Sequence, residues 1–264
     1  MKSNSQSITL LLILTFSYTS LLSSLTSVLA KPTLPASARS QVVRFAPPPP
    51  PPGPPPGGRP TGGASRGGSL SMCPTVKTQL TALVPFTEEP AKVKNVWGLT
   101  TVERPSWLFY VPYTKDSAYP AEFVLQDQES NSIYQKAIAL PGRSGVIRVS
   151  LPADAPALEV GKQYRWFFSV YCDQQKESPP IYIEGVIQRV NLKQTTVQEL
   201  DKAEPFKRFV IYAQNGIWYE TLTTLAELHQ KNPQDTKLQA EWRDLLASIG
   251  LDKLATEPIF LETR

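Results

Sequence analysis

The hydrophobic pattern of the chain changes near residue 190, and the two parts predict different structures. Between residues 79 and 190, short apolar runs recur about every ten residues and are separated by turn-forming residues, as in all-β sandwiches and barrels. We predict eight strands, within the segments QLTALVP (79–85), VWGLTTV (96–102), SWLFYVP (106–112), AEFVLQDQ (121–128), SIYQKAIAL (132–140), GVIRVSL (145–151), QYRWFFSVYC (163–172) and IYIEGVIQRV (181–190).

The seventh predicted strand indicates the type of sandwich. Leu158, Gly161 and Tyr164 have the spacing of a tyrosine corner, in which a Tyr at the start of a late strand bonds back to the preceding turn. This corner is characteristic of immunoglobulin-like and fibronectin-like sandwiches. Alternate residues of the strand then share one face, namely Tyr164, Trp166, Phe168, Val170 and Cys172. We therefore expect an immunoglobulin-like sandwich over residues 73–194, with Cys172 pointing toward its core.

Some of these strands are apolar on both faces. The stretch from Trp107 to Val111 shows no alternation, and Phe167 and Tyr171 crowd the outer face of their strand. A sheet face in contact with water should alternate, so another layer must cover it. Residues 195–264 carry apolar residues at helical spacing, and we expect them to form that layer.

The helical region contains the segment QNGIWYETLTTLAELHQKNPQD (214–235), which resembles the second half of a tetratricopeptide repeat. Gly216 and Trp218 stand at its turn and Asn232-Pro233 at its end. A single repeat cannot bury its own apolar faces, and no second copy follows. We predict a helical hairpin plus a third helix, Lys237 to Ser248, which Gly250 ends, packed as a cap on the sandwich. The cap is either a peptide-binding groove or purely structural, and the second interpretation is favoured.

The N-terminus predicts export. Lys2, an apolar stretch from Ile8 to Phe16 and the small residues ending at Ala30 form a signal peptide over residues 1–30, with a second possible cleavage site at Ala36-Ser37-Ala38. The alternative is an uncleaved membrane anchor, since 8–30 is long enough to span a bilayer. Cleavage leaves no membrane span, and we expect a periplasmic or extracellular protein.

Residues 31–72 differ in composition from the rest. Ten of the 26 prolines lie between Pro47 and Pro60, followed by a Gly- and Arg-rich stretch, GGRPTGGASRGG (57–68). A phosphate-binding loop would join a strand to a helix, and neither flanks this stretch. We therefore predict a disordered linker, with a polyproline II spacer before a basic segment. The segment is either a plain linker or an electrostatic contact with an anionic envelope polymer.

Charge is distributed as unevenly as proline. The formal net charge is +4, from 27 Lys and Arg against 23 Asp and Glu. Six of the 27 basic residues and none of the acids precede Cys73, which leaves 21 basic residues against 23 acidic ones in the remainder. The positive charge therefore belongs to the N-terminal segment, and export excludes a nucleic-acid partner.

Export also changes how the two cysteines are interpreted. In an oxidising compartment, two cysteines far apart in sequence are more often a disulfide than a redox pair. We predict a Cys73–Cys172 disulfide, with two unconnected buried thiols as the alternative.

Several of these stretches occur together in a known family. GGASRGG, LTALVP, GLTT, LFYVPY, AEFVLQD, VSLP, YRWFFSVYC, EGVIQRV and GIWYETLTTLAEL jointly resemble the cyanobacterial secreted proteins of domain of unknown function family 928 (DUF928). The resemblance covers most of the chain after Gly57. It implies an envelope or extracellular protein and supplies no catalytic residues.

Candidate chemistry is sparse. The single histidine, His229, stands among polar residues, which favours a surface or capping role over catalysis. With two cysteines in a disulfide, too few ligands remain for a Cys/His metal site, so we predict no metal, cofactor or catalytic residue. The residues around Asp127, DQESN, lack the glycine and distant Glu of a calcium loop and predict a hairpin turn. Asp173 and Glu184 are the candidate pair for glycoside cleavage.

Aromatic residues offer a binding hypothesis instead. Tyr113 and Tyr119, in the loop PYTKDSAYP, are the aromatic residues least easily buried and could stack on a sugar ring. We therefore expect a non-enzymatic exported protein that binds an envelope protein or glycan. The alternative is a hydrolase acting on envelope polysaccharide. No pattern in the sequence predicts an oligomeric state.

Overall fold

The computed structural model describes residues 43–49, 55–62, 73–90, 92–117 and 119–261. The predicted signal peptide and its alternative as an anchor lie outside these residues. Within them, no helix combines the length and apolar character needed to cross a membrane.

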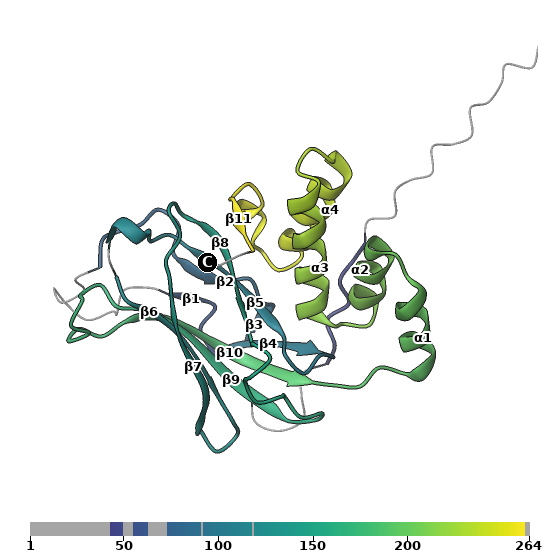
Figure 1. Ribbon diagram of the computed structural model, residues 1–264, viewed down its shortest axis with the longest axis horizontal. Coiled ribbons are helices and arrows are strands. Elements are labelled where there is room, and N and C mark those ends of the chain that lie inside the picture. Colours follow the sequence, from purple (N-terminus) through teal and green to yellow (C-terminus); the bar gives the residue numbers. More distant parts are fainter. Residues whose placement is uncertain (1–42, 50–54, 63–72, 91, 118, 262–264) are drawn as a thin grey trace, which may run out of the picture. The chain divides into compact units, whose positions relative to one another are not determined.

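Two mixed β-sheets form the larger part of the described chain (Figure 1). The first has the strand order β1-β2-β5-β8-β11 and the second β3-β4-β10-β9-β6-β7. Most pairs are antiparallel, but β8 and β11 are parallel, as are β4 and β10. The strands are β1 (Thr61–Gly62), β2 (Leu80–Ala82), β3 (Phe86–Glu88), β4 (Lys94–Thr100), β5 (Ser106–Val111), β6 (Ala121–Gln126), β7 (Ser132–Ile138), β8 (Gly145–Ser150), β9 (Gln163–Val170), β10 (Ile181–Arg189) and β11 (Ile259–Phe260).

All eight predicted segments contain a strand. The alternation on β6 and β9 matches the burial of every second side chain, since these strands face the other sheet on one side. Phe109 of β5 is the centre of an aromatic cluster between the sheets. Its ring lies 5.5 Å from that of Trp166 and 4.8 Å from that of Phe168, both on β9. The hydrophobic core therefore lies between the two sheets.

Four α-helices follow the strands: α1 (Gln194–Lys202), α2 (Pro205–Gln214), α3 (Trp218–Lys231) and α4 (Thr236–Ala247). Short 3₁₀ turns occur at η1 (Lys115–Ser117) and η2 (Asp252–Leu254). The helices α2 and α3 form the predicted hairpin, and α4 is the predicted third helix. The prediction of three helices was wrong, because α1 is an additional one. Residues 195–264 are also not entirely a cap, because β11 returns to pair with β8.

Helix α3 covers the outer face of the first sheet, as the apolar pattern of β5 predicted. Leu108 and Arg148 are directly opposite each other on β5 and β8 and so share this face. Arg148 forms an ion pair with Glu227 of α3, with 2.7 Å between the guanidinium and the carboxylate. Helix α3 therefore supplies the layer that shields the second apolar face of β5.

Two segments of the predicted disordered linker, residues 43–49 and 55–62, belong to the fold, which corrects the prediction for them; the rest of the linker lies outside the described residues. Ala46 donates its N–H to the carbonyl of Ala213 at the end of α2, at 3.1 Å. Arg59 and Glu184 of β10 exchange two backbone hydrogen bonds of 2.9 and 3.0 Å. The Arg59 guanidinium lies over the Tyr182 ring, 4.5 Å from its centre. Proline has no backbone N–H, so a proline-rich segment can donate few hydrogen bonds to a neighbouring strand. Here the Gly and Arg residues supply these donors.

Candidate functional site

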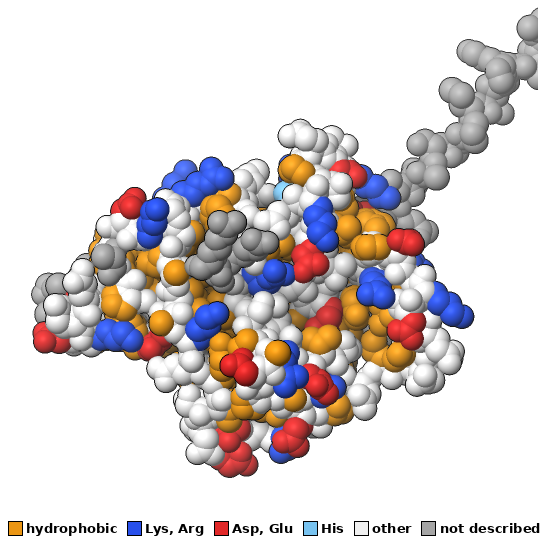
Figure 2. All heavy atoms as spheres, in the orientation of Figure 1, with side chains coloured by type: hydrophobic (Ala, Val, Ile, Leu, Met, Phe, Trp, Pro, Cys, Tyr) orange, Lys and Arg blue, Asp and Glu red, His pale blue; other side chains and the backbone are white. Residues whose placement is uncertain are grey.

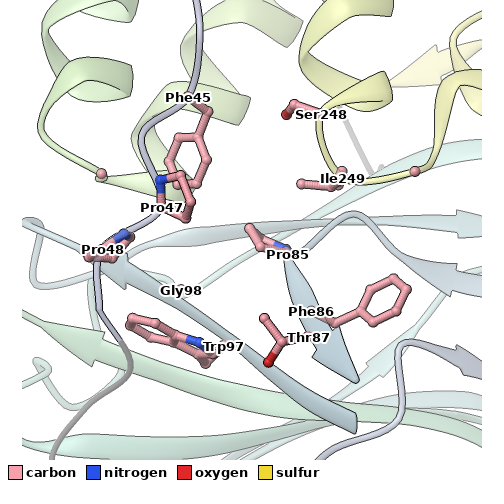
Figure 3. A pocket seen from close by; sticks show the side chains of 12 residues that line it. Phe45, Pro47, Pro48, Pro85, Phe86, Thr87, Trp97, Gly98, Ser248 and Ile249 are labelled. Atoms are coloured by element: carbon pink, nitrogen blue, oxygen red, sulfur yellow. The ribbon is translucent and has the colours of Figure 1, made fainter. Parts of the chain in front are cut away.

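An apolar cavity lies where the N-terminal segment, the second sheet and the end of α4 meet (Figure 3). Its volume is about 350 Å³, within the range of ordinary ligand pockets. We call it the aromatic pocket. It is lined by Phe45, Pro47, Pro48, Pro85, Phe86, Thr87, Trp97, Gly98, Gly216, Ser248, Ile249 and Gly250.

Residues 43–48, which we call the strap, form one wall of the aromatic pocket. The Phe45 ring packs edge-on against Trp218 of α3, with 4.8 Å between the ring centres. The strap passes close to the α2–α3 turn at Gly216, where φ is +71°. A Cβ atom added to Gly216 would lie 2.8 Å from the carbonyl oxygen of Ala46. Glycine is thus required here both by the backbone conformation and by the approach of the strap.

The opposite wall comes from β3 and β4. Phe86 of β3 and Trp97 of β4 both line this wall, and Ile249 lies across the cavity, in the segment after α4 (Figure 3). The Trp97 side chain is 9% exposed, whereas the other four tryptophans are fully buried. At Gly98 an added Cβ would lie 3.1 Å from the ring of Tyr219, so its absence lets α3 approach β4.

Two hydrogen bonds that involve the first turn of α3 hold the walls of the pocket in place. The indole N–H of Trp218 donates to the carbonyl of Leu83 at 2.8 Å, and that of Trp166 donates to the hydroxyl of Tyr219 at 3.1 Å. These bonds connect one helical turn to both sheets. The pocket walls are therefore held by buried side chains rather than by surface loops.

Glu220 is the next residue of the same turn and is buried. Its carboxylate accepts hydrogen bonds from the hydroxyl of Thr100 at 2.6 Å and from the N–H of Thr101 at 3.0 Å. Burial nevertheless dominates and raises the pKa of Glu220 to about 7. Glu220 does not line the aromatic pocket, so we assign it to the joint between α3 and β4.

The chemistry of the aromatic pocket follows from its lining. None of the lining residues has an ionisable side chain, and only two carry a hydroxyl. The hydroxyl of Ser248 already donates to the carbonyl of Leu245 at 2.6 Å. A sugar needs several directed hydrogen bonds, whereas an apolar group needs only the aromatic and proline surfaces. The pocket is therefore suited to an apolar group and offers no group for acid–base chemistry.

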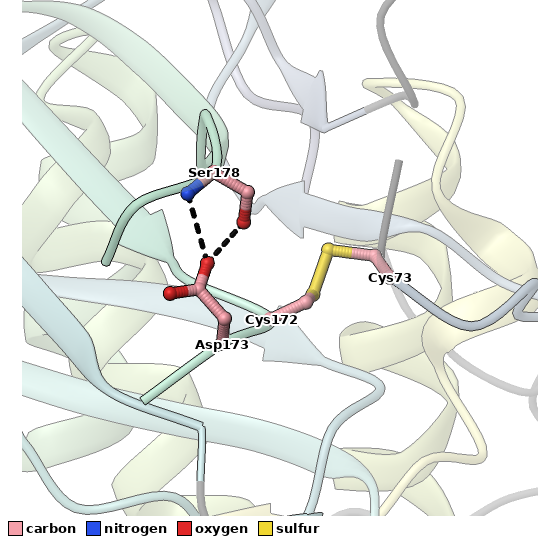
Figure 4. Close-up of a disulfide and its surroundings, with 4 residues drawn as sticks. All are labelled: Cys73, Cys172, Asp173 and Ser178. Atoms are coloured by element: carbon pink, nitrogen blue, oxygen red, sulfur yellow. Dashed lines mark hydrogen bonds between the residues drawn. A yellow bond between two sulfur atoms is a disulfide. The ribbon is translucent and has the colours of Figure 1, made fainter. Parts of the chain in front are cut away.

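The predicted disulfide is confirmed: Cys73 and Cys172 are bonded, with 5.0 Å between their Cα atoms (Figure 4). The side chain of Cys172 is buried, as the alternation on β9 predicted. The bond connects the end of β9 to the segment that precedes β2.

The predicted corner bond is also present. The N–H of Glu159 donates to the hydroxyl of Tyr164 at 3.0 Å, which ties the start of β9 to the turn before it. Leu158 is fully buried beneath this turn, and Gly161 has a φ of +83° within it.

The two tyrosines proposed as a stacking platform differ in how far they are exposed to solvent. Tyr113 is only 3% exposed and packs on Tyr119, with 5.9 Å between the ring centres. Burial raises the pKa of the Tyr113 hydroxyl. The expectation that Tyr113 is hard to bury was wrong, because Tyr119 covers it. Of the pair, Tyr119 is the one that is partly exposed.

The candidate catalytic carboxylates do not share a cavity. Asp173 lies at the disulfide and accepts hydrogen bonds from the backbone N–H and hydroxyl of Ser178 (Figure 4), which lower its pKa. Glu184 lies inside β10 and forms an ion pair with Arg165 at 3.4 Å. Asp127 accepts two hydrogen bonds from Asn131 in the β6–β7 turn, which confirms the predicted hairpin. Among the described residues, no cluster of three or more His, Cys, Asp or Glu could hold a metal ion.

Sequence analysis missed the aromatic pocket, because Phe45, Pro47 and Pro48 lie in the predicted linker. The available signal was the alternation of apolar Val43 and Phe45 immediately before the prolines, in a segment otherwise poor in large apolar side chains. Two apolar residues are too few to define a strand by periodicity.

Comparison with known proteins identifies a family. No curated protein matches the chain. The family model described as Domain of Unknown Function (DUF928) matches residues 61–259, which is well over half of the 264 residues. The chain therefore belongs to the DUF928 family.

Proposed function

We propose that this protein is an exported, non-enzymatic binding protein and that the aromatic pocket takes an apolar side chain of a protein partner. The observation that carries the proposal is a cavity of about 350 Å³ with three aromatic side chains, three prolines and no ionisable group in its lining. Buried aromatic anchors in such pockets dominate the energy of many protein interfaces.

Export is supported by the sequence of residues 1–30 and by the disulfide, which persists in oxidising compartments. We place the mature protein in the periplasm or outside the cell. Lys and Arg side chains are interspersed with Asp and Glu on the face shown in Figure 2, so this face offers no broad basic surface for nucleic acid. The proposal requires no cofactor.

We further propose that the sandwich is immunoglobulin-like and the helical part tetratricopeptide-like. The Tyr164 corner bond supports the first assignment, and the α2–α3 hairpin with its Gly216 turn supports the second. In a tetratricopeptide-like unit, an extended segment beside the hairpin occupies the position of a bound peptide. The hydrogen bond from Ala46 to Ala213 and the packing of Phe45 on Trp218 support this comparison for the strap.

Ligand-observed NMR tests the pocket. We expect saturation transfer from the protein to N-acetyl-tryptophanamide, a neutral mimic of an aromatic side chain, and none to methyl glucoside. Replacing Thr87, an exposed residue in the lining, by Trp should fill the cavity and abolish the signal. Ala137→Trp is the matched control, because Ala137 is exposed on β7 and away from the pocket.

Two outcomes would contradict the proposal. Equal transfer in the Thr87→Trp and Ala137→Trp variants would show that the aromatic probe binds elsewhere. Transfer to methyl glucoside that Thr87→Trp removes would show that the pocket binds glycans. Circular dichroism of both variants confirms that the comparison is between folded proteins.

A further inference from the structure

A second cavity, of about 490 Å³, lies between the end of α3, α4, the β7–β8 loop and the segment that leads into β11. It shares no lining residue with the aromatic pocket. We call it the arginine pocket. Its lining is Arg143, His229, Gln230, Pro233, Gln239, Arg243, Ala255, Thr256, Glu257, Pro258 and Ile259.

Two arginines from distant parts of the chain converge on this cavity. Arg143 comes from the β7–β8 loop and Arg243 from α4. Neither guanidinium forms an ion pair or a hydrogen bond with any described residue. They differ in this from the other arginines that the structure describes after residue 73, each of which donates to a protein oxygen: Arg104, Arg148, Arg165, Arg189 and Arg208.

The surroundings orient these two groups without neutralising them. The Arg143 guanidinium lies over the Phe260 ring, 5.6 Å from its centre, and this contact positions the charge without using an N–H group. Glu257 is the only carboxylate in the lining, against two guanidiniums, so the cavity has a net positive charge. A guanidinium donates paired N–H groups that match the oxygens of a carboxylate or phosphate.

The other lining residues are suited to the uncharged, hydroxyl-bearing part of a ligand. Gln230, Gln239 and Thr256 supply amides and a hydroxyl, and Pro233 and Pro258 supply flat apolar surfaces. His229 is partly buried beside Trp242, with 6.0 Å between the rings, and burial lowers the pKa of its imidazole. The imidazole is thus neutral at neutral pH and can both donate and accept a hydrogen bond. The volume exceeds that of an inorganic anion and suits one sugar ring.

We propose that the arginine pocket binds an anionic sugar unit, with Arg143 and Arg243 on its carboxylate or phosphate group and the amides of Gln230 and Gln239 on its hydroxyls. This site is independent of the aromatic pocket. It makes the protein able to hold a charged glycan and a protein partner at the same time.

Isothermal titration calorimetry of the full mature chain at low salt tests this site. We expect glucuronate or glucose 6-phosphate to bind and neutral glucose not to bind. A preference between the two anions identifies a uronic acid or a phosphorylated sugar as the ligand. Arg143→Gln and Arg243→Gln should each weaken binding by about tenfold, the loss of one charge-assisted contact. Both arginines are exposed, so these variants should remain folded.

Lys253→Gln is the control, because Lys253 is an exposed cation near the cavity but outside its lining. An equal loss of affinity in Lys253→Gln would overturn the proposal, since it would indicate general attraction of anions. Binding of inorganic phosphate as tight as that of glucose 6-phosphate would overturn the assignment to sugars. Absence of heat with both anionic sugars at millimolar concentration would refute the site.

Discussion

Glu220 makes the stability of the protein depend on pH in an unusual direction. Its pKa in the folded protein is about 7 against an ordinary value of 4.5, because burial disfavours the carboxylate. Below pH 4.5 the group is protonated in both states, and its contribution to stability is fully present. As the pH rises toward 7, the unfolded chain ionises first, so the free energy of unfolding falls. The difference in pKa corresponds to about 3 kcal/mol lost across this window.

The perturbation that isolates this effect is Glu220→Gln. The amide oxygen can still accept the hydrogen bond from Thr100, but its NH₂ group faces the N–H of Thr101, so the variant carries a fixed cost. That cost does not change with pH. Tyr212, whose pKa burial and the nearby Glu220 raise from its ordinary value of 10.0, stays protonated between pH 4 and pH 8. The buried Glu241 is common to both proteins, so its contribution cancels in the difference.

Urea unfolding at several values between pH 4 and pH 8 measures this difference. We expect the stability of the wild type relative to Glu220→Gln to fall by about 3 kcal/mol between pH 4.5 and pH 7 and then to level off. A difference that stays constant with pH would show that Glu220 is ionised throughout and would refute the reasoning. A rise with pH would mean that the hydrogen bonds from Thr100 and Thr101 outweigh burial.

Three further predictions follow from particular contacts. Removing the disulfide by Cys73→Ser with Cys172→Ser should cost about 4 kcal/mol of unfolding free energy, since it releases a long loop in the unfolded chain; an unchanged urea midpoint would contradict this. Gly98→Ala should cost about 1 to 3 kcal/mol, because its methyl group would meet Tyr219, whereas Gly142→Ala, with only a distant lysine carbon nearby, is the neutral control. Gly216→Ala should cost more than Gly250→Ala, because both have positive φ but only the first would push against the strap; equal losses in urea unfolding would show that the strap does not press on the turn.

Hydrophobic periodicity predicted the strands and helices that are long and that bury one face against another layer of the protein. The seven strands β4 to β10, each of six residues or more, and the α2–α3 hairpin follow from spacing, and Cys172 follows from the alternation on β9. The three-residue strand β3 was not predicted. The two-residue strands β1 and β11 have no period to detect. Helix α1 was missed because it is mostly polar and buries only Leu200.

The candidate sites were beyond sequence analysis for a different reason. The aromatic pocket joins Phe45, Trp97 and Ile249, and the arginine pocket joins Arg143 and Arg243, so both exist only after distant segments meet. Composition also gave a wrong prediction at residues 43–49 and 55–62, where the many prolines indicated disorder. A few backbone hydrogen bonds and the packing of one phenylalanine decide the structure of these two segments.

The docked strap sets where a recombinant fragment of this protein can begin. The family match starts at Thr61, and a fragment cut there would lack Phe45, Pro47 and Pro48, together with the chain that pairs with Glu184. Such a fragment would leave the surface beside Trp218 and the backbone of Glu184 on β10 open to another extended peptide. A fragment trimmed to residues 61–259 would therefore have an artificial binding surface. Both signal cleavage sites considered above lie before Val43 and leave the strap in the mature chain.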